Sequence, residues 1–118
     1  MWTIDLFVKD NGRCPTQDFL DKLSPSADLP YIRKRFGQLE EHGYKLDRPL
    51  AAHLGDGIYE LRIKTINGQF RFFYFFYVGN TIVVTHGAKK KTNQVPASEK
   101  EQAIACRKIY YARYGMKP

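Results

Sequence analysis

Alternating apolar and polar positions dominate the middle of the chain, from Gly57 to Lys91. Three segments there are rich in aromatic and β-branched residues, and two turn signals, Asn67-Gly68 and Gly79-Asn80, separate them. An Asn-Gly pair favours a tight hairpin turn, because both central positions of a type I′ turn require positive φ. The pattern therefore predicts a three-stranded antiparallel meander.

Two-residue loops at both turns would fix the register of this meander, since side chains alternate across a strand. The expected pairs are Arg62–Phe73, Lys64–Arg71, Phe73–His86 and Phe75–Val84. One face then carries Glu60, Arg62, Lys64, Arg71, Phe73 and His86. The apolar core face carries Tyr59, Leu61, Ile63, Phe70, Phe72, Tyr74, Phe76 and Val83. Like charges opposite each other destabilise a sheet, so Lys64 facing Arg71 indicates an anion site. A one-residue bulge would move His86 to the other face.

Helical periodicity before the meander predicts two helices that follow a first strand over residues 2–8. Thr16 is a candidate N-cap for the first helix. Ser26 or Asp28 is a candidate cap for the second helix, and Gly43 is a natural end for it. These helices would form a hairpin that covers one face of the sheet.

Two weaker signals flank the meander. Residues 48–54 fit either a connector or a short strand, and Ser98 with Glu101 has the spacing of a capping box that opens a final helix. The order β-α-α-(β)-β-β-β-α predicts one α+β domain over residues 1–118. Its sheet would be antiparallel, with an N-terminal helical hairpin and a C-terminal helix.

Charge and cysteine content narrow the partners and the compartment. The 118 residues include 19 Lys plus Arg against 12 acidic residues, a formal net charge of +7 that favours an anionic partner such as nucleic acid. No apolar run has membrane-spanning length and no signal peptide precedes the first strand, so we expect a cytoplasmic protein. Cys14 and Cys106 have no metal-ligand spacing and are expected to be reduced, with Cys106 in the core.

The residue types on the charged face suit RNA cleavage without a metal or other cofactor. Arginine and lysine stabilise negative charge on a scissile phosphate, a group with a near-neutral pKa moves protons, and the ribose 2′-hydroxyl is the nucleophile. His86 is the natural proton-transfer group. Glu60 is either an alternative base or a partner of Arg62, His53 is a further candidate, and Phe73 either stacks on a base or lies under the last helix.

At these residues the chain resembles the RelE/ParE toxin superfamily, in particular its phage-derived HigB-like branch. The resemblance rests on Leu-Gly-Asp-Gly-Ile-Tyr-Glu-Leu-Arg (54–62), Phe-Arg-Phe-Phe-Tyr (70–74) and His-Gly-Ala-Lys-Lys-Lys-Thr-Asn-Gln-Val-Pro (86–96). It implies a RelE-like fold, a toxin of a type II toxin–antitoxin system, and cleavage of mRNA on the ribosome. It also implies a helix-turn-helix antitoxin (HigA-like) as partner, and contact with operator DNA through the antitoxin complex.

The resemblance also implies roles for individual residues. Arg71 matches the arginine that contacts the scissile phosphate, and Lys89 and Lys90 match basic positions after the last strand. Pro96 lies near a functional tyrosine of RelE-type relatives, so His86, Lys91 or a tyrosine of the last helix would take its place. The predicted catalytic residues are Arg71, His86, Lys90 and Lys91, and the predicted RNA-binding residues are Arg62, Lys64, Lys89 and Phe73.

Two other functions fit the same sequence. The superfamily includes gyrase poisons, which would cause DNA damage without mRNA cleavage. A non-enzymatic basic module would bind nucleic acid in a salt-sensitive way without turnover.

Overall fold

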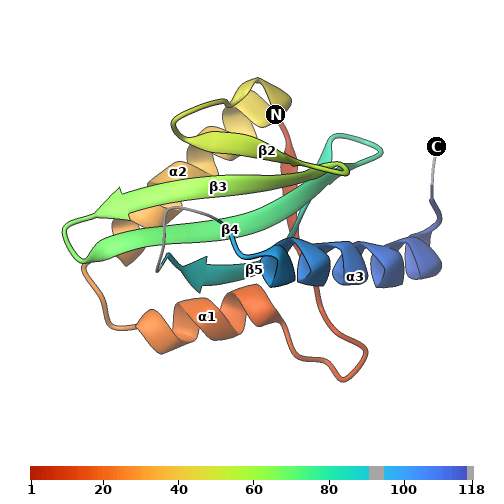
Figure 1. Ribbon diagram of the computed structural model, residues 1–118, viewed down its shortest axis with the longest axis horizontal. Coiled ribbons are helices and arrows are strands. Elements are labelled where there is room, and N and C mark those ends of the chain that lie inside the picture. The colour runs from red at the N-terminus through yellow and green to blue at the C-terminus, as the bar shows by residue number, and fades with distance from the viewer. Residues whose placement is uncertain (91–94, 117–118) are drawn as a thin grey trace.

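The computed structural model describes residues 1–90 and 95–116, and a five-stranded sheet forms its centre (Figure 1). The strand order is β1-β5-β4-β3-β2. The strands are β1 (Thr3–Leu6), β2 (Ala51–Gly55), β3 (Ile58–Thr65), β4 (Gly68–Tyr77) and β5 (Thr81–Lys89). The helices are α1 (Pro15–Leu23), α2 (Leu29–His42) and α3 (Ala97–Tyr114), with a 3₁₀ turn, η1 (Gly43–Lys45), after α2.

The α+β class and the order of the elements are confirmed. Residues 48–54, for which the sequence left a connector or a strand open, contribute β2, which pairs antiparallel with β3. The sheet is mixed rather than wholly antiparallel, because β1 runs parallel to β5. Over residues 1–90 and 95–116, no helix is both long and apolar enough to cross a membrane.

The β3–β4 hairpin is displaced by two residues from the predicted register. Its loop is Ile66-Asn67, so Arg62 faces Arg71 and Lys64 faces Gln69. The Asn67 backbone N–H donates to the hydroxyl of Thr65 (3.1 Å), and its side-chain amide donates to Asp28 of the α2 cap (3.1 Å). Asn67 is the second residue of the loop rather than the first, and Gly68 begins β4. Because side chains alternate with a period of two, the shift leaves the predicted faces of β3 and β4 unchanged.

A β-bulge interrupts the pairing of β4 with β5. Phe73 pairs with His86 as predicted, but Tyr74 pairs with Val84, so Thr85 is an extra residue. From there to the turn the register differs by one, and Phe75 faces Val83 instead of Val84. The loop has three residues, Val78–Asn80, and Asn80 takes the left-handed conformation (φ 62°) that such loops favour. His86 therefore keeps its predicted face, whereas Val83 moves off the predicted core face.

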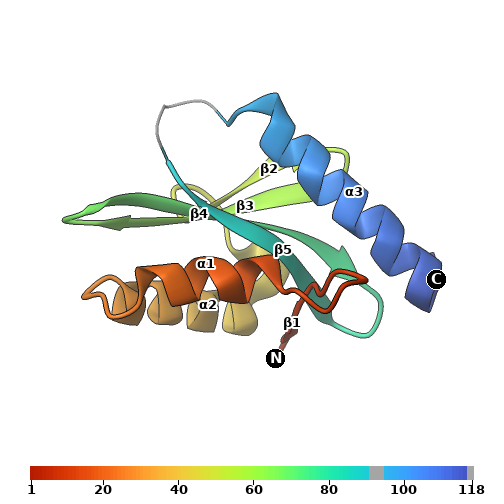
Figure 2. The same ribbon diagram turned by 90° about the horizontal axis from the view of Figure 1, so that it is seen from below.

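Each face of the sheet packs against helices, so the molecule has two cores (Figure 2). Helices α1 and α2 cover the first face, where Leu61, Phe72, Tyr74 and Val84 are buried against Ile32 and Leu39. Helix α3 crosses the second face with Ala103, Cys106 and Tyr110, which contact a cluster of buried side chains. That cluster is Phe7, Ile58, Phe73, Phe75 and Val83. The predicted charged face is thus charged at only one end.

The helix ends agree with the predicted caps only in part. Thr16 is the second residue of α1, which begins at Pro15, where proline is well tolerated because its fixed φ suits the first turn. Asp28 occupies the N-cap position of α2, but its side chain bonds Asn67 rather than the helix. Ser98 lies inside α3 and forms no capping box, since Pro96 occupies the N-cap position. Gly43 ends α2 as predicted.

Candidate active site

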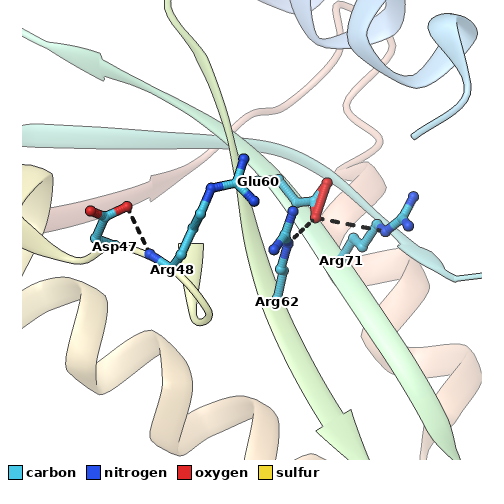
Figure 3. A network of polar contacts seen from close by, with 5 residues as sticks. All are labelled: Asp47, Arg48, Glu60, Arg62 and Arg71. Carbon is cyan, nitrogen blue, oxygen red and sulfur yellow. Dashed lines mark hydrogen bonds and ion pairs between the residues drawn. The ribbon is translucent and has the colours of Figure 1, made fainter. Parts of the chain in front are cut away.

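A buried carboxylate organises the charged end of the sheet. The Glu60 carboxylate of β3 lies between two arginines: its Oε1 accepts from Arg62 Nε at 2.6 Å and lies 3.8 Å from Arg71 Nε (Figure 3). The side chains of Glu60 and Arg71 are 1% and 5% exposed, whereas Arg62 is 36% exposed. Figure 3 also shows the Arg48 side chain extending toward this cluster.

This arrangement explains how two arginines can face each other across β3 and β4. Arg62 and Arg71 are direct cross-strand partners, a placement that repulsion would otherwise disfavour. Glu60 supplies the opposite charge between them, so the predicted partnership of Glu60 with Arg62 is confirmed and extends to Arg71. The predicted pairing of Lys64 with Arg71 is wrong, because the hairpin register differs by two residues.

A groove of about 530 Å³ opens between the end of β5 and the start of α3. We call it the Arg71 groove; its lining residues are Arg71, Ala88, Lys89, Lys90, Pro96, Ser98 and Glu99. It brings together three cations that the sequence predicted as site residues, Arg71, Lys89 and Lys90. One acidic side chain, Glu99, stands among them.

Glu99 is bonded to the histidine of β5. His86 Nε2 lies 3.2 Å from Glu99 Oε1, and His86 Nδ1 lies 2.9 Å from the hydroxyl of Thr85. The imidazole stacks on Phe73, with ring centroids 4.8 Å apart. Burial lowers the pKa of His86 below its usual value, although the nearby Glu99 carboxylate opposes that shift.

The lowered pKa and the hydrogen bonds together identify the nitrogen of the His86 ring that carries the proton. A neutral imidazole has one N–H, and an ionised carboxylate can only accept a hydrogen bond. Nε2 of His86 therefore donates to Glu99. The hydroxyl of Thr85, which lies 2.9 Å from Nδ1, donates its proton to the backbone carbonyl of Phe73 at 3.2 Å. His86 itself is 4% exposed. The Glu99 side chain is 24% exposed and lines the groove, so a ligand in the groove can contact Glu99 but not the buried imidazole.

The other predicted site residues lie elsewhere. Arg62, Lys64 and Lys90 line a second, neighbouring pocket. Phe73 is fully buried under α3, so its ring is not open to a base in this structure. Lys91 lies outside the described residues.

The remaining proton-transfer candidates do not line the Arg71 groove. His53 is on β2, where it stacks on Tyr59 with ring centroids 4.6 Å apart. Tyr110 of α3 is buried and donates its hydroxyl to Asp5 (2.9 Å), and Tyr111 packs on Phe75 and Tyr77. Within residues 1–90 and 95–116, no three His, Cys, Asp or Glu side chains gather closely enough to hold a metal ion.

Glu99 is the site residue that the sequence did not indicate. Its neighbourhood suggested only the start of a helix, and nothing in its spacing connects it with a histidine 13 positions earlier. The link depends on where α3 crosses β5, which the sequence pattern does not specify.

Comparison with known families supports the resemblance at the level of a toxin-like family, and not of one branch within it. The family model of phage-derived Gp49-like proteins (DUF891) matches residues 18–108, which include α2, the four strands from β2 to β5 and most of α3. No curated protein matches the chain. The matched segment contains every described residue of the Arg71 groove and both members of the His86–Glu99 pair. The chain therefore belongs to the Gp49-like family of phage-derived proteins, a family of toxin-like proteins of the RelE/HigB type.

Proposed function

We propose that this protein is the toxin of a type II toxin–antitoxin system and cleaves mRNA on the ribosome without a metal ion. One observation carries the proposal: a single groove contains three cations and a carboxylate that is hydrogen-bonded to a buried histidine. Cations suit the charge of a phosphodiester, and the carboxylate supplies the proton acceptor that cleavage by the 2′-hydroxyl requires. Membership of a toxin-like family supports the biological role.

The proposed reaction is an internal transfer at phosphorus. Glu99 takes the proton of the ribose 2′-hydroxyl, whose oxygen attacks the adjacent phosphorus. Arg71 and Lys89 stabilise the negative charge that develops on the phosphate oxygens. The ammonium of Lys90 gives a proton to the departing 5′-oxygen. The products are a 2′,3′-cyclic phosphate and a 5′-hydroxyl end.

His86 acts behind the carboxylate in this scheme. Its Nε2–H bond to Glu99 fixes the carboxylate side chain in the groove. Phe73 supports the imidazole by stacking. His86 is thus a positioning residue, and Glu99 is the member of this pair that touches substrate.

The partners follow from the same proposal. A toxin requires an antitoxin, and we propose a helix-turn-helix protein of the HigA type, which would also connect the complex to operator DNA. The site of action would be the translating ribosome in the cytoplasm. The net charge of +7 favours approach to ribosomal and messenger RNA.

Induced expression tests the proposal directly. We expect growth arrest, with primer extension showing new 5′ ends inside translated codons. Arg71→Ala should abolish both effects while the protein stays folded, since removal of one transition-state charge donor typically costs roughly 10²–10³-fold in rate. Arg33→Ala, which removes an exposed arginine of α2, is the matched control and should remain toxic.

Two outcomes would contradict the proposal. One is normal growth in cells that accumulate the full-length folded protein. The other is undiminished mRNA cleavage by a folded Arg71→Ala variant. Salt-sensitive RNA binding without any cleavage would instead favour a non-enzymatic binding module.

A further inference from the structure

We propose that a second pocket, adjacent to the Arg71 groove, binds a neighbouring phosphate group of the same RNA strand. This inference rests on the proposed function, because it assigns the extra phosphate to the RNA substrate. We call the site the Arg35 pocket; it has a volume of about 320 Å³. Its lining residues are Arg35, Pro49, Leu50, Arg62, Ile63, Lys64, Gln69 and Lys90.

The charge of this pocket is one-sided. Four of its lining residues are cations, Arg35, Arg62, Lys64 and Lys90, and none is acidic. They come from α2, β3 and the residue that follows β5, so the fold gathers them from three separate parts of the chain. Pro49, Leu50 and Ile63 form apolar walls, which strengthen electrostatic attraction by limiting access of water.

Arg35 shows most clearly that the pocket suits an anion. Its Nε and Nη1 atoms are buried, yet neither has a hydrogen-bond partner among the described residues. Burial also lowers the pKa of this guanidinium. Buried donors without acceptors destabilise a fold, and charged donors do so most. A phosphate in the pocket would supply the missing acceptors in the geometry that a guanidinium matches best.

Arg62 is already oriented for the same ligand. Its Nε is bonded to Glu60 at 2.6 Å, and its backbone N–H donates to the carbonyl of Leu50 at 2.8 Å. These two bonds hold the residue at the pocket wall. The Arg62 side chain is nevertheless 36% exposed, so a ligand can reach it from solvent.

Lys90 connects the pocket with the Arg71 groove, since it lines both. Its backbone N–H donates to the carbonyl of Gln69 at 2.7 Å, which holds the residue at the edge of β4 between the two sites. Two anion sites that share one lysine suit a ligand with phosphates in series. A single-stranded polynucleotide is such a ligand, and its bases would remain free to contact the ribosome or solvent.

The test is the salt dependence of binding to an uncleavable 2′-O-methyl oligoribonucleotide. Wild type, Arg35→Gln and Lys34→Gln are compared; Lys34 is the matched control because it is exposed on the same helix and lines neither site. We expect Arg35→Gln to bind roughly tenfold more weakly, the effect of losing one charged hydrogen-bonding group. The slope of log K against log salt should also fall by about 0.7, the value for one phosphate contact on a single strand.

Lys34→Gln should retain nearly wild-type affinity and slope. Equal binding by Arg35→Gln and Lys34→Gln would overturn the assignment of the pocket. If Arg35→Gln does not fold, Arg35→Lys keeps the charge but loses the planar fork, and it should bind with intermediate affinity. Wild-type affinity in a folded Arg35→Lys variant would equally count against a site built around the guanidinium.

A second ligand separates this inference from the proposed function. Inorganic pyrophosphate is titrated against the same variants, and it should raise the melting temperature of wild type more than that of Arg35→Gln. Binding of pyrophosphate without binding of the oligonucleotide would overturn the assignment to RNA. Loss of toxicity in Arg71→Ala tests the proposed function separately, because Arg71 does not line the Arg35 pocket.

Discussion

Glu60→Gln isolates the charge that holds two arginines together at the site. Glutamine keeps the size and shape of the side chain but removes its negative charge. Arg62 and Arg71 then face each other across the strands without the carboxylate between them. Removing one partner from a buried ion pair typically costs 3–5 kcal/mol.

The geometry places the expected cost at the lower end of that range. Arg71 is almost fully buried, but its Nε lies 3.8 Å from Glu60 Oε1, beyond direct hydrogen-bond distance. The contact with Arg62 is short, yet that side chain is 36% exposed, so solvent screening reduces its share to less than about 1 kcal/mol. We therefore expect a loss of about 3 kcal/mol. For a domain of 118 residues this corresponds to a fall in Tm of roughly 12 °C.

Calorimetry and urea unfolding in phosphate-free buffer measure this loss. Glu101→Gln is the control, because Glu101 is exposed on α3 and should change stability by no more than about 0.5 kcal/mol. Added inorganic phosphate should stabilise Glu60→Gln more than wild type, since an anion can replace the lost charge between the arginines. A Tm equal to that of the control, or no extra stabilisation by phosphate, would refute this account of Glu60.

Two further predictions concern pH and packing. Burial lowers the pKa of His86, so the unfolded chain binds more protons below the usual histidine pKa of about 6.5; stability should fall as the pH drops from about 7 to 5. Urea unfolding across this range should show a flatter dependence of stability on pH for His86→Gln and a steeper one for Glu99→Gln. Identical dependences for wild type and His86→Gln would contradict the assignment of this effect to His86. Gly43→Ala should destabilise by more than about 1 kcal/mol, because Gly43 has φ +54° and an added Cβ would collide with the indole of Trp2, the sole tryptophan. The tryptophan fluorescence and the Tm of the Gly43→Ala variant should change. Gly37→Ala is the control, because the added Cβ meets no atom within 4 Å on the exposed side of α2. This variant should keep wild-type fluorescence and gain about 0.5–1 kcal/mol of stability.

Most of the fold was predictable from the spacing of apolar residues along the chain. Alternation fixed the strands of the meander and the faces of β3 and β4, and these faces persisted when the hairpin register moved by two residues. The parallel pairing of β1 with β5 was not predictable, since it joins segments nearly 80 positions apart and leaves no local signal. The sequence indicated the second core only through Cys106 and through one of two alternatives for Phe73, because burial of Phe73 and Phe75 depends on α3 crossing that face.

The site was predictable as a set of charges but not as an arrangement. Arg71, Lys89 and Lys90 do line one groove, as their positions around the end of the meander suggested. Glu99 and Arg35 line the two pockets because α3 and α2 pack beside the sheet. No spacing in the sequence predicts that either residue lies near the sheet. The expectation that His86 would meet substrate did not allow for its burial beneath Glu99 and α3.

The bulge at Thr85 has a consequence for how relatives should be aligned. Tyr74 pairs with Val84 and Phe73 pairs with His86. A chain that lacked only Thr85 would therefore form an uninterrupted ladder, and all remaining side chains of β5 would stay on the faces that they occupy here. Both cores would survive, and His86 would lose the hydroxyl that lies beside its Nδ1. In an alignment, a one-residue gap at this position would therefore identify relatives that keep the fold and hold the histidine by other contacts. Gaps elsewhere in β5 would exchange buried and exposed residues and should be rare.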